Sequence, residues 1–348
     1  MTIVREDSDG RREFANLLCD FMFKRLFGSE ANKDVLIWFL NMVLEDVDIV
    51  DVTFSPTEHP GLTEEDRKVI FDISCTCSDG RTFIIEMQKG YQRHFRERAL
   101  YYTTYPINEQ GRQARELFDK EKTSGKAVGR FRWDYALKPV IVVAILNFRF
   151  DHGGQWPSER YSSSYRIRED TTGELMSDSL RFVFLELGRF RKGLHELETV
   201  FEKLIYLLKH MHELEAIPEN FNEPMFTRLF LLAEIGNFTP EEYKYYLNSL
   251  KNMGDYYNII HTAEEEAEKR GLEKGIAQGR AEGLVLGRAE GKAEGITEGL
   301  AKGKAEGITE GEQSKAREIA MRLIADGMSI DKVSDLTGID VEILNTIT

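Results

Sequence analysis

One run of residues in the middle of the chain constrains the fold most. Residues 139–148, PVIVVAILNF, are almost continuously apolar and rich in β-branched side chains. This pattern is typical of a strand that is buried on both faces. Such a strand belongs to a sheet that helices cover on both sides. The chain has 348 residues, which is enough for one such domain and one or two smaller parts.

Three more strands are predicted before this run, at residues 47–55, 69–77 and 82–88, because β-branched and alternating residues prevail there, and the last two form a hairpin. Helical periodicity follows from about residue 93 to Tyr105, and Pro106 is expected to break or kink that helix. The order hairpin, helix, buried strand predicts an α/β core with a crossover helix. Other helices are predicted at 14–28, 33–44, 194–215 and 225–261, and another strand at 181–187.

The turn between the strands at 69–77 and 82–88 decides where two carboxylates lie. A plain two-residue turn would put Asp72 and Glu86 on opposite faces of the hairpin. A type I turn with Gly80 as a left-handed bulge residue instead pairs Cys77 with Arg81 and sets Asp72 opposite Glu86. We predict the bulge, because it also gathers the apolar side chains of both strands on one face: Phe71, Ile73, Cys75, Cys77, Phe83, Ile85 and Met87.

Two carboxylates that face each other across a hairpin have β-carbons roughly 5 Å apart. They repel each other and favour a cation between them. Their oxygen ligands suit Mg²⁺ or Mn²⁺, and such an ion can activate water for attack on a phosphodiester. Gln88 would share the face of Glu86. An edge strand whose polar residues face solvent would show the same pattern, so the pattern alone leaves both interpretations open.

The charge distribution limits how this chain could meet a nucleic acid. The net charge is −14, and global acidity opposes the approach of phosphate. One segment, residues 89–132, is rich in lysine and arginine and could supply a local basic surface, although a solvated helix face would look the same.

No apolar segment is long enough for a membrane helix, and the charged amino terminus has no export signal. The three cysteines have no metal-type spacing. These features predict a cytoplasmic protein with reduced thiols and no membrane partner.

The carboxyl-terminal part differs in kind from the rest of the chain. Every fourth residue from Gly271 to Gly311 is glycine. A helix with this repeat carries a stripe of small residues that lets a second helix approach closely. We therefore predict a helical stalk that makes the protein a homo-oligomer; the alternative is a flexible linker, because each glycine costs a helix about 1 kcal/mol. Residues 314–348 predict a small helical element, too acidic for DNA recognition.

The succession of motifs resembles the PD-(D/E)xK nuclease superfamily, and within it the recombination-promoting nucleases of the Rpn family, which are often described as transposases. Residues 20–28 (DFMFKRLFG), 71–73 (FDI), 85–88 (IEMQ) and 98–102 (RALYY) carry the resemblance, together with the buried strand. The resemblance covers roughly residues 14–260. It implies a restriction-endonuclease-like α/β core: a mixed sheet flanked by helices, with a helical extension and the glycine-repeat tail.

The resemblance also assigns roles to individual residues. Asp72 and Glu86 would be metal ligands, with the main-chain carbonyl of Met87 as a third. Gln88 stands where the superfamily has lysine; it would orient water or a phosphate oxygen, because it brings no charge. Lys89 should face the other side of the sheet. Four residues would contact nucleic acid or support the site, a structural role being the alternative: Asp20, Lys24, Arg98 and Tyr102.

Together these observations predict four parts: a nuclease core at 1–190, a helical extension at 191–270, the glycine repeat at 271–313 and a helical end at 314–348. The predicted function is a Mg²⁺-dependent DNA endonuclease linked to recombination or mobile elements. The alternative is a nuclease fold whose chemistry has lapsed and which binds DNA or assembles complexes.

Overall fold

The structure, a computed structural model, describes residues 12–59, 69–152 and 156–347. The chain forms two compact units, residues 1–260 and 261–348. The charged amino-terminal segment that we interpreted as carrying no export signal lies almost wholly outside the described residues. No helix in the described ranges is long and apolar enough to cross a membrane.

A six-stranded mixed sheet forms the centre of the first unit, in the order β1-β4-β5-β6-β8-β7. Its inner strands β5, β6 and β8 are parallel, and the other neighbours are antiparallel. The predicted α/β class is confirmed, and the run at 139–148 supplies β6, all of whose residues are buried. The strands are β1 (Val52–Phe54), β4 (Ile73–Cys77), β5 (Thr82–Gln88), β6 (Val140–Leu146), β7 (Ser162–Tyr165) and β8 (Leu180–Glu186), and a separate pair is β2 (Glu58–His59) with β3 (Val69–Ile70).

The predicted bulge joins β4 and β5. Gly80 has a φ of +89°, and its N–H donates to the carbonyl of Cys77 at 3.0 Å. The N–H of Cys77 donates in turn to the carbonyl of Arg81 at 2.9 Å. Ile73 therefore pairs with Ile85, and the next pair in this register is Asp72 and Glu86.

The prediction of one unbroken strand over residues 69–77 was wrong. The chain bends at Phe71 and Asp72, between β3 and β4, and the N–H of Phe71 donates to the carbonyl of Thr57 at 2.9 Å. Because alternation holds only within a regular strand, Phe71 does not share the face of Ile73. It packs instead on the opposite face, against Tyr102.

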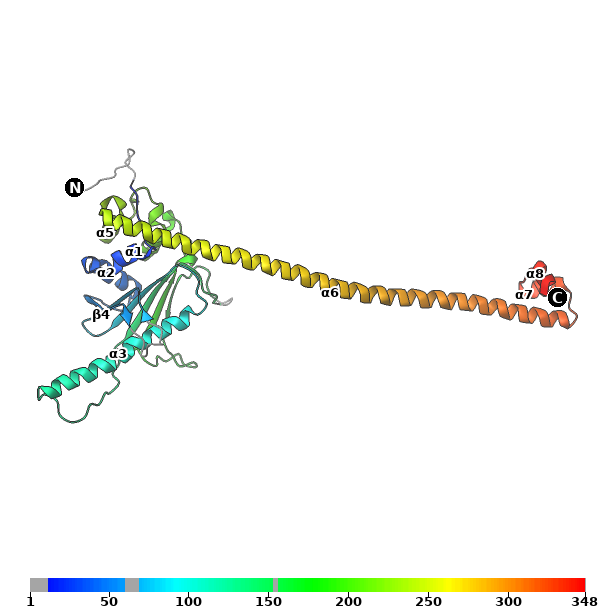
Figure 1. Ribbon diagram of the computed structural model, residues 1–348, viewed down its shortest axis with the longest axis horizontal. Helices are drawn as coiled ribbons and strands as arrows, with labels where there is room; N and C mark the ends of the chain where they lie inside the picture. Colours follow the sequence, from blue (N-terminus) through cyan, green and yellow to red (C-terminus); the bar gives the residue numbers. More distant parts are fainter. Residues whose placement is uncertain (1–11, 60–68, 153–155, 348) are drawn as a thin grey trace. The chain divides into compact units, whose positions relative to one another are not determined.

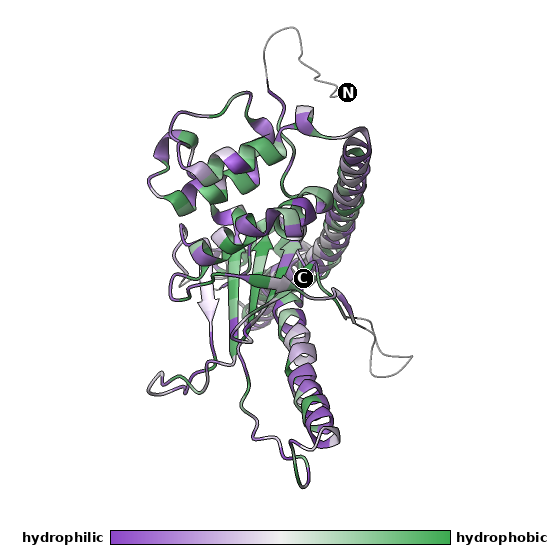
Figure 2. Cartoon of the chain, turned by 90° about the vertical axis from the view of Figure 1, so that its left-hand side faces the viewer, coloured by the Kyte–Doolittle hydropathy of each residue, from purple (hydrophilic) through white to green (hydrophobic). Residues whose placement is uncertain are grey.

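Helices cover both faces of the sheet (Figure 1). One face packs against α1 (Asp20–Phe27), α2 (Lys33–Val43), α4 (Val200–His210), α5 (Pro224–Ala233) and the beginning of α6. The other face packs against α3 (Phe95–Thr123). Figure 2 shows the apolar strands between these layers and the mainly polar far part of α3. Short 3₁₀ turns lie at Glu30–Asn32, Leu187–Arg189, Leu194–Glu196, Met211–Glu213 and Ile235–Asn237.

Helix boundaries differ from the prediction at several places. The helix predicted at 194–215 is α4 with a 3₁₀ turn before and after it, and the helix predicted at 225–261 is divided into α5 and α6 by the 3₁₀ turn Ile235–Asn237. The first helix begins at Asp20 rather than at residue 14, because Phe14 forms a β-bridge with Glu234 and Ala15 donates to the carbonyl of Ala233. Pro106 does not end α3, which continues to Thr123. Proline removes one helical hydrogen bond, and the burial of the Pro106 side chain offsets part of that cost.

Helix α6 extends from Pro240 to Ala325, so the glycine repeat is helical in the structure. The expected boundaries at 270/271 and 313/314 fall inside this helix, and secondary structure does not mark them. Two short helices, α7 (Ile330–Thr337) and α8 (Val341–Ile347), follow. They pack on the end of α6 around Ala320, Val333 and Leu344.

Candidate functional site

The bend at the start of β4 brings the two predicted carboxylates together. The N–H of Asp72 donates to Oε1 of Glu86 at 3.2 Å. The N–H of Met87 donates to Oδ2 of Asp72 at 2.8 Å. Because the chain leaves the β4 ladder here, the Asp72 side chain takes the place that a neighbouring strand would have filled. The Glu86 carboxylate thus accepts from the main chain of Asp72, and the Asp72 carboxylate accepts from the main chain next to Glu86.

Burial sets the charge state of this pair. Glu86 is 2% exposed, and burial, followed by the nearby Asp72 carboxylate, raises its pKa from 4.5 to about 8. The pKa of Asp72 is also raised, mainly by burial. In both cases the fold shifts the preference toward the protonated acid, because desolvation and mutual repulsion oppose two negative charges. A bound cation would reverse that preference.

Gln88 is buried beside Glu86 on the same face of β5. Its Nε2 donates to Oε2 of Glu86 at 3.1 Å, and its Oε1 accepts from Gln92 at 2.9 Å. Arg98 donates to the Gln92 amide oxygen and lies 3.6 Å from Glu86 Oε2. These four side chains form a closed ring, which fixes the orientation of the Gln88 amide.

Helix α3 places Arg98 and Tyr102 against the ring. They lie one turn apart, and the Arg98 guanidinium stands 5.2 Å from the centre of the Tyr102 ring. Burial, followed by the charge of Glu86, raises the pKa of Tyr102. The Nε of Arg98 is buried and has no hydrogen-bond partner among the described residues. Arg98 therefore retains a donor while it offsets part of the carboxylate charge.

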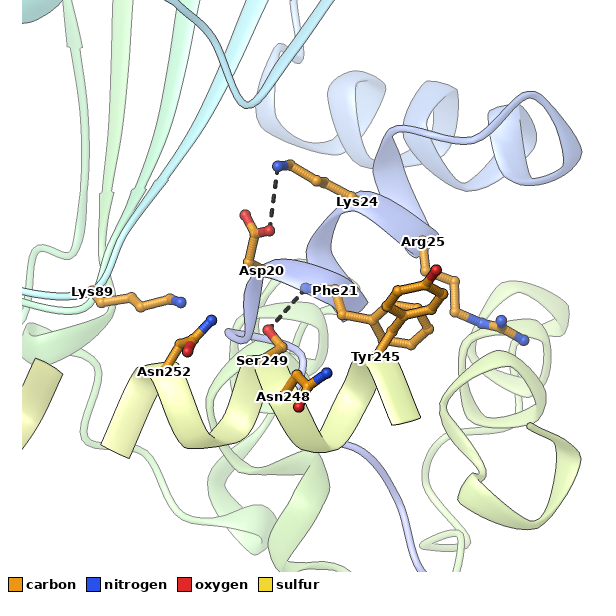
Figure 3. Close-up of a pocket in the computed structure, with 9 residues that line it drawn as sticks. All are labelled: Asp20, Phe21, Lys24, Arg25, Lys89, Tyr245, Asn248, Ser249 and Asn252. Carbon is orange, nitrogen blue, oxygen red and sulfur yellow. Dashed lines mark hydrogen bonds and ion pairs between the residues drawn. The ribbon is translucent and has the colours of Figure 1, made fainter. Parts of the chain in front are cut away.

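Asp20 and Lys24 approach from the opposite side, on α1. Their side chains pair at 3.2 Å and are about half exposed (Figure 3). Both charges act on Asp72, Asp20 raising its pKa and Lys24 lowering it. Lys89 also lies on this side, in a cavity between α1 and α6, as alternation along β5 predicted. All the predicted site residues thus lie around the end of β5. Helix α3 supplies Arg98 and Tyr102, and α1 supplies Asp20 and Lys24.

The donor set of this site suits a hard divalent cation. The N–H of Met87 points to the Asp72 side of β5, and the carbonyl of a strand residue points to the same side as its N–H. Two carboxylates and a main-chain carbonyl are oxygen ligands of the kind that Mg²⁺ and Mn²⁺ prefer. Within the described ranges no cluster of three or more His, Cys, Asp or Glu side chains could hold a metal, so water or substrate oxygens would complete the coordination.

Two polar groups near the site were missed in the sequence. Gln92 lies in the short connection after β5, where no periodic pattern marks it. Glu186 ends β8 and is 1% exposed; it accepts from the N–H of Phe150 at 2.7 Å and lies 2.6 Å from Nε2 of His152. Its position at the end of a predicted strand was a usable signal. Its partners show that it holds the chain after β6 in place.

The basic segment is less uniformly positive than its composition suggests. Arg112 pairs with Glu109 and Glu116, and Arg115 pairs with Asp119, all along α3. The remaining basic residues toward the end of α3 and beyond it are exposed: Lys120, Lys122, Lys126, Arg130 and Arg132. Among the described residues, basic side chains without an acidic partner therefore lie at the far end of α3 and in the loop that follows, and also at Lys89 and Arg93 before α3.

Comparison with known proteins agrees with this architecture. A family model described as PD-(D/E)XK nuclease family transposase matches residues 17–263. This range contains the sheet, α1 to α5, the carboxylate pair and the beginning of α6. Neither the curated proteins nor the solved structures gave a match. The matched range is well over half of the chain, and the chain belongs to the PD-(D/E)XK nuclease family of transposases.

Proposed function

We propose that the chain is a metal-dependent DNA endonuclease that hydrolyses phosphodiester bonds in recombination or in the movement of mobile elements. The observation that carries the proposal is the buried pair Asp72 and Glu86 at the end of β5. Burying two acids costs stability unless they are neutralised, and a protein that only needed a fold would gain by apolar residues there. Membership of a nuclease family supports the same conclusion.

In this mechanism Asp72, Glu86 and the Met87 carbonyl would hold the cation. The bound ion would lower the pKa of water and stabilise the charge that develops on the phosphate. Gln88, oriented by Gln92 and Glu86, has a second amide N–H with which to position that water or a phosphate oxygen. No lysine stands at this position, so the positive charge near the phosphate would come from Arg98 and from Lys24 on α1.

Cleavage of supercoiled plasmid by the purified protein tests the proposal. Nicking should require Mg²⁺ or Mn²⁺ and should fall at least a hundredfold in Asp72→Asn and Glu86→Gln. Asp79→Asn is the matched control, because Asp79 lies in the turn of the same hairpin and contacts only Arg81 among the residues that the structure describes. Its activity should equal that of the wild type.

Two outcomes would contradict the endonuclease. Nicking that survives both site variants would point to a contaminating enzyme or to another centre. Binding of DNA without cleavage under any divalent metal would support the second candidate, a lapsed nuclease fold that binds DNA or assembles complexes.

We also propose that α6 mediates homo-oligomer formation through the glycine repeat. All eleven glycines from Gly271 to Gly311 lie in helix with no neighbouring atom where a β-carbon would be. Exposed apolar side chains accompany the stripe, among them Leu272, Ile276 and Leu284. Sedimentation of a peptide covering residues 271–311, with circular dichroism, tests it; a monomeric coil at high concentration would exclude the stalk.

A further inference from the structure

A cavity of about 670 Å³ opens beside the candidate site, on the α1 side of β5. Its walls come from α1, from the first residue after β5 and from α6 (Figure 3). The volume lies within the range of small-molecule and cofactor sites. Most of the residues that line it carry a polar group, among them Lys24, Lys89, Asn248, Ser249 and Asn252.

The wall that α6 provides is anchored on both sides of the strand ends. Ser249 accepts from the N–H of Phe21 at 3.1 Å, and Tyr257 accepts from the amide of Asn147 at 2.9 Å. Gly90 lets α6 pass closely, because a β-carbon there would lie 2.0 Å from the hydroxyl oxygen of Tyr256. The cavity is therefore a built feature of the fold between fixed elements.

Several polar side chains in the cavity have no partner among the described residues. The side chains of Lys89, Asn248 and Asn252 make no hydrogen bond or ion pair within that part of the chain. Figure 3 shows the Lys89 amine and the Asn252 amide directed toward the same space. Arg25 differs, because its guanidinium pairs with Glu242. The unsatisfied groups are thus one cation and two amides, and Lys24 adds a second cation, paired with Asp20.

This combination fits the parts of a nucleotide. Ammonium groups bind phosphate, and a carboxamide can both donate to and accept from a base edge. Tyr245 stacks on Phe21, with ring centres 6.4 Å apart and planes at 23°. Tyr245 itself is 54% exposed, and an exposed aromatic ring offers a stacking surface for an unpaired base.

The cavity shares residues with the surroundings of Asp72. Lys89 directly follows Gln88, and Asp20 and Lys24 act on Asp72 while lining the cavity. These shared residues are the ground for placing a neighbouring nucleotide in the cavity when the phosphate of the strand lies at Asp72. A paired base could not enter, because it would remain in the duplex stack.

We propose that this cavity is a subsite for one unpaired nucleotide next to the scissile phosphate, with Lys89 and Lys24 on its phosphate and Asn248 and Asn252 on its base. The assignment rests on the proposed nuclease function for its position in the substrate. It makes the enzyme selective for DNA with an unpaired or extruded base at the cut.

Binding of a labelled single-stranded oligonucleotide, followed by fluorescence anisotropy in Ca²⁺, tests the subsite without cleavage. Each nucleotide is made abasic in turn. At one position the abasic strand should bind wild-type protein about tenfold more weakly, as expected for the loss of one stacked and hydrogen-bonded base. Asn252→Ala should bind the intact strand more weakly by a similar factor and should show little further loss with the abasic strand.

Lysine variants supply the second arm. Lys89→Ala should weaken binding of intact and abasic strands alike and should reduce the salt dependence, because it removes a phosphate contact. Lys251→Ala, an exposed lysine on α6 outside the cavity, is the control and should leave affinity unchanged.

The outcomes separate the subsite from the nuclease. Coupling between Asn252 and one base in a protein that cleaves nothing would support the subsite and remove the proposed function. The subsite would be overturned, and the nuclease retained, by a protein that cleaves DNA but whose affinity is insensitive to every abasic position. The same holds if the affinity losses from Asn252→Ala and from the abasic strand are additive.

Discussion

Glu86→Gln should stabilise the metal-free protein at neutral and alkaline pH. The pKa of Glu86 is raised from 4.5 to about 8, so the folded state binds a proton more tightly than the unfolded chain does. Stability is then lost as pH rises from about 4.5 to 8. Glutamine cannot ionise, and the variant avoids that loss.

The size of the effect follows from the contacts of Glu86. One pKa unit corresponds to about 1.4 kcal/mol, and the shift spans several units, part of it shared with Asp72. Glutamine also turns an amide N–H toward a group that donates to Glu86, either the Asp72 N–H or the Gln88 amide, which costs about 1 to 2 kcal/mol. The net gain at pH 8 should be about 1 to 3 kcal/mol, or a rise in Tm of roughly 2 to 10 °C.

Differential scanning calorimetry in EDTA at pH 5.5 and pH 8 measures this effect. The gain should be larger at pH 8, and Mg²⁺ should raise the Tm of the wild type more than that of the variant. Glu202→Gln is the opposite control: Glu202 is 9% exposed and pairs with Lys192, contacts that hold its pKa low against the effect of burial. That variant should be less stable at pH 8. A wild type as stable as Glu86→Gln at pH 8 would refute the reasoning.

Three further predictions concern the turn, the oriented amide and the repeat. Gly80→Ala should cost about 1 to 2 kcal/mol in chemical denaturation because of its positive φ; Gly236→Ala, which has open space and no positive φ, should change little, and equal effects would contradict the bulge. Gln88→Lys should lower the pH of half-maximal cleavage, because an ammonium beside Glu86 favours its ionised form; an unchanged pH profile would exclude this coupling. Replacing Gly283 and Gly287 by alanine should increase helicity in circular dichroism but weaken self-association in sedimentation, whereas unchanged association would show that the glycines do not pack.

Local patterns in the sequence predicted much of the site. The alternation along residues 82–88 and the Asp79-Gly80 turn were enough to choose the register, because one-residue shifts would move every apolar side chain to the wrong face. That register placed Asp72 next to Glu86, and it also sent Lys89 to the side opposite Gln88. The continuous apolar run at 139–148 fixed a doubly covered strand. Each of these conclusions depends on neighbours in sequence or on one strand pair.

Tertiary structure decided what depends on contacts between distant segments. The bend at Phe71 arises because its N–H donates to the carbonyl of Thr57, and no local sequence pattern predicts that partner. The ring from Glu86 through Gln92 to Arg98 needs α3 to cross the end of β5.

The cavity needs α6, more than 150 residues beyond β5 in the chain, to pass over Gly90. Periodicity reports which face of an element is buried, but it carries no information about which other element buries it. For this protein the sequence by itself determined the paired carboxylates and their strand. Only the packing of α1, α3 and α6 around that strand decided how the pair is neutralised and what lies beside it.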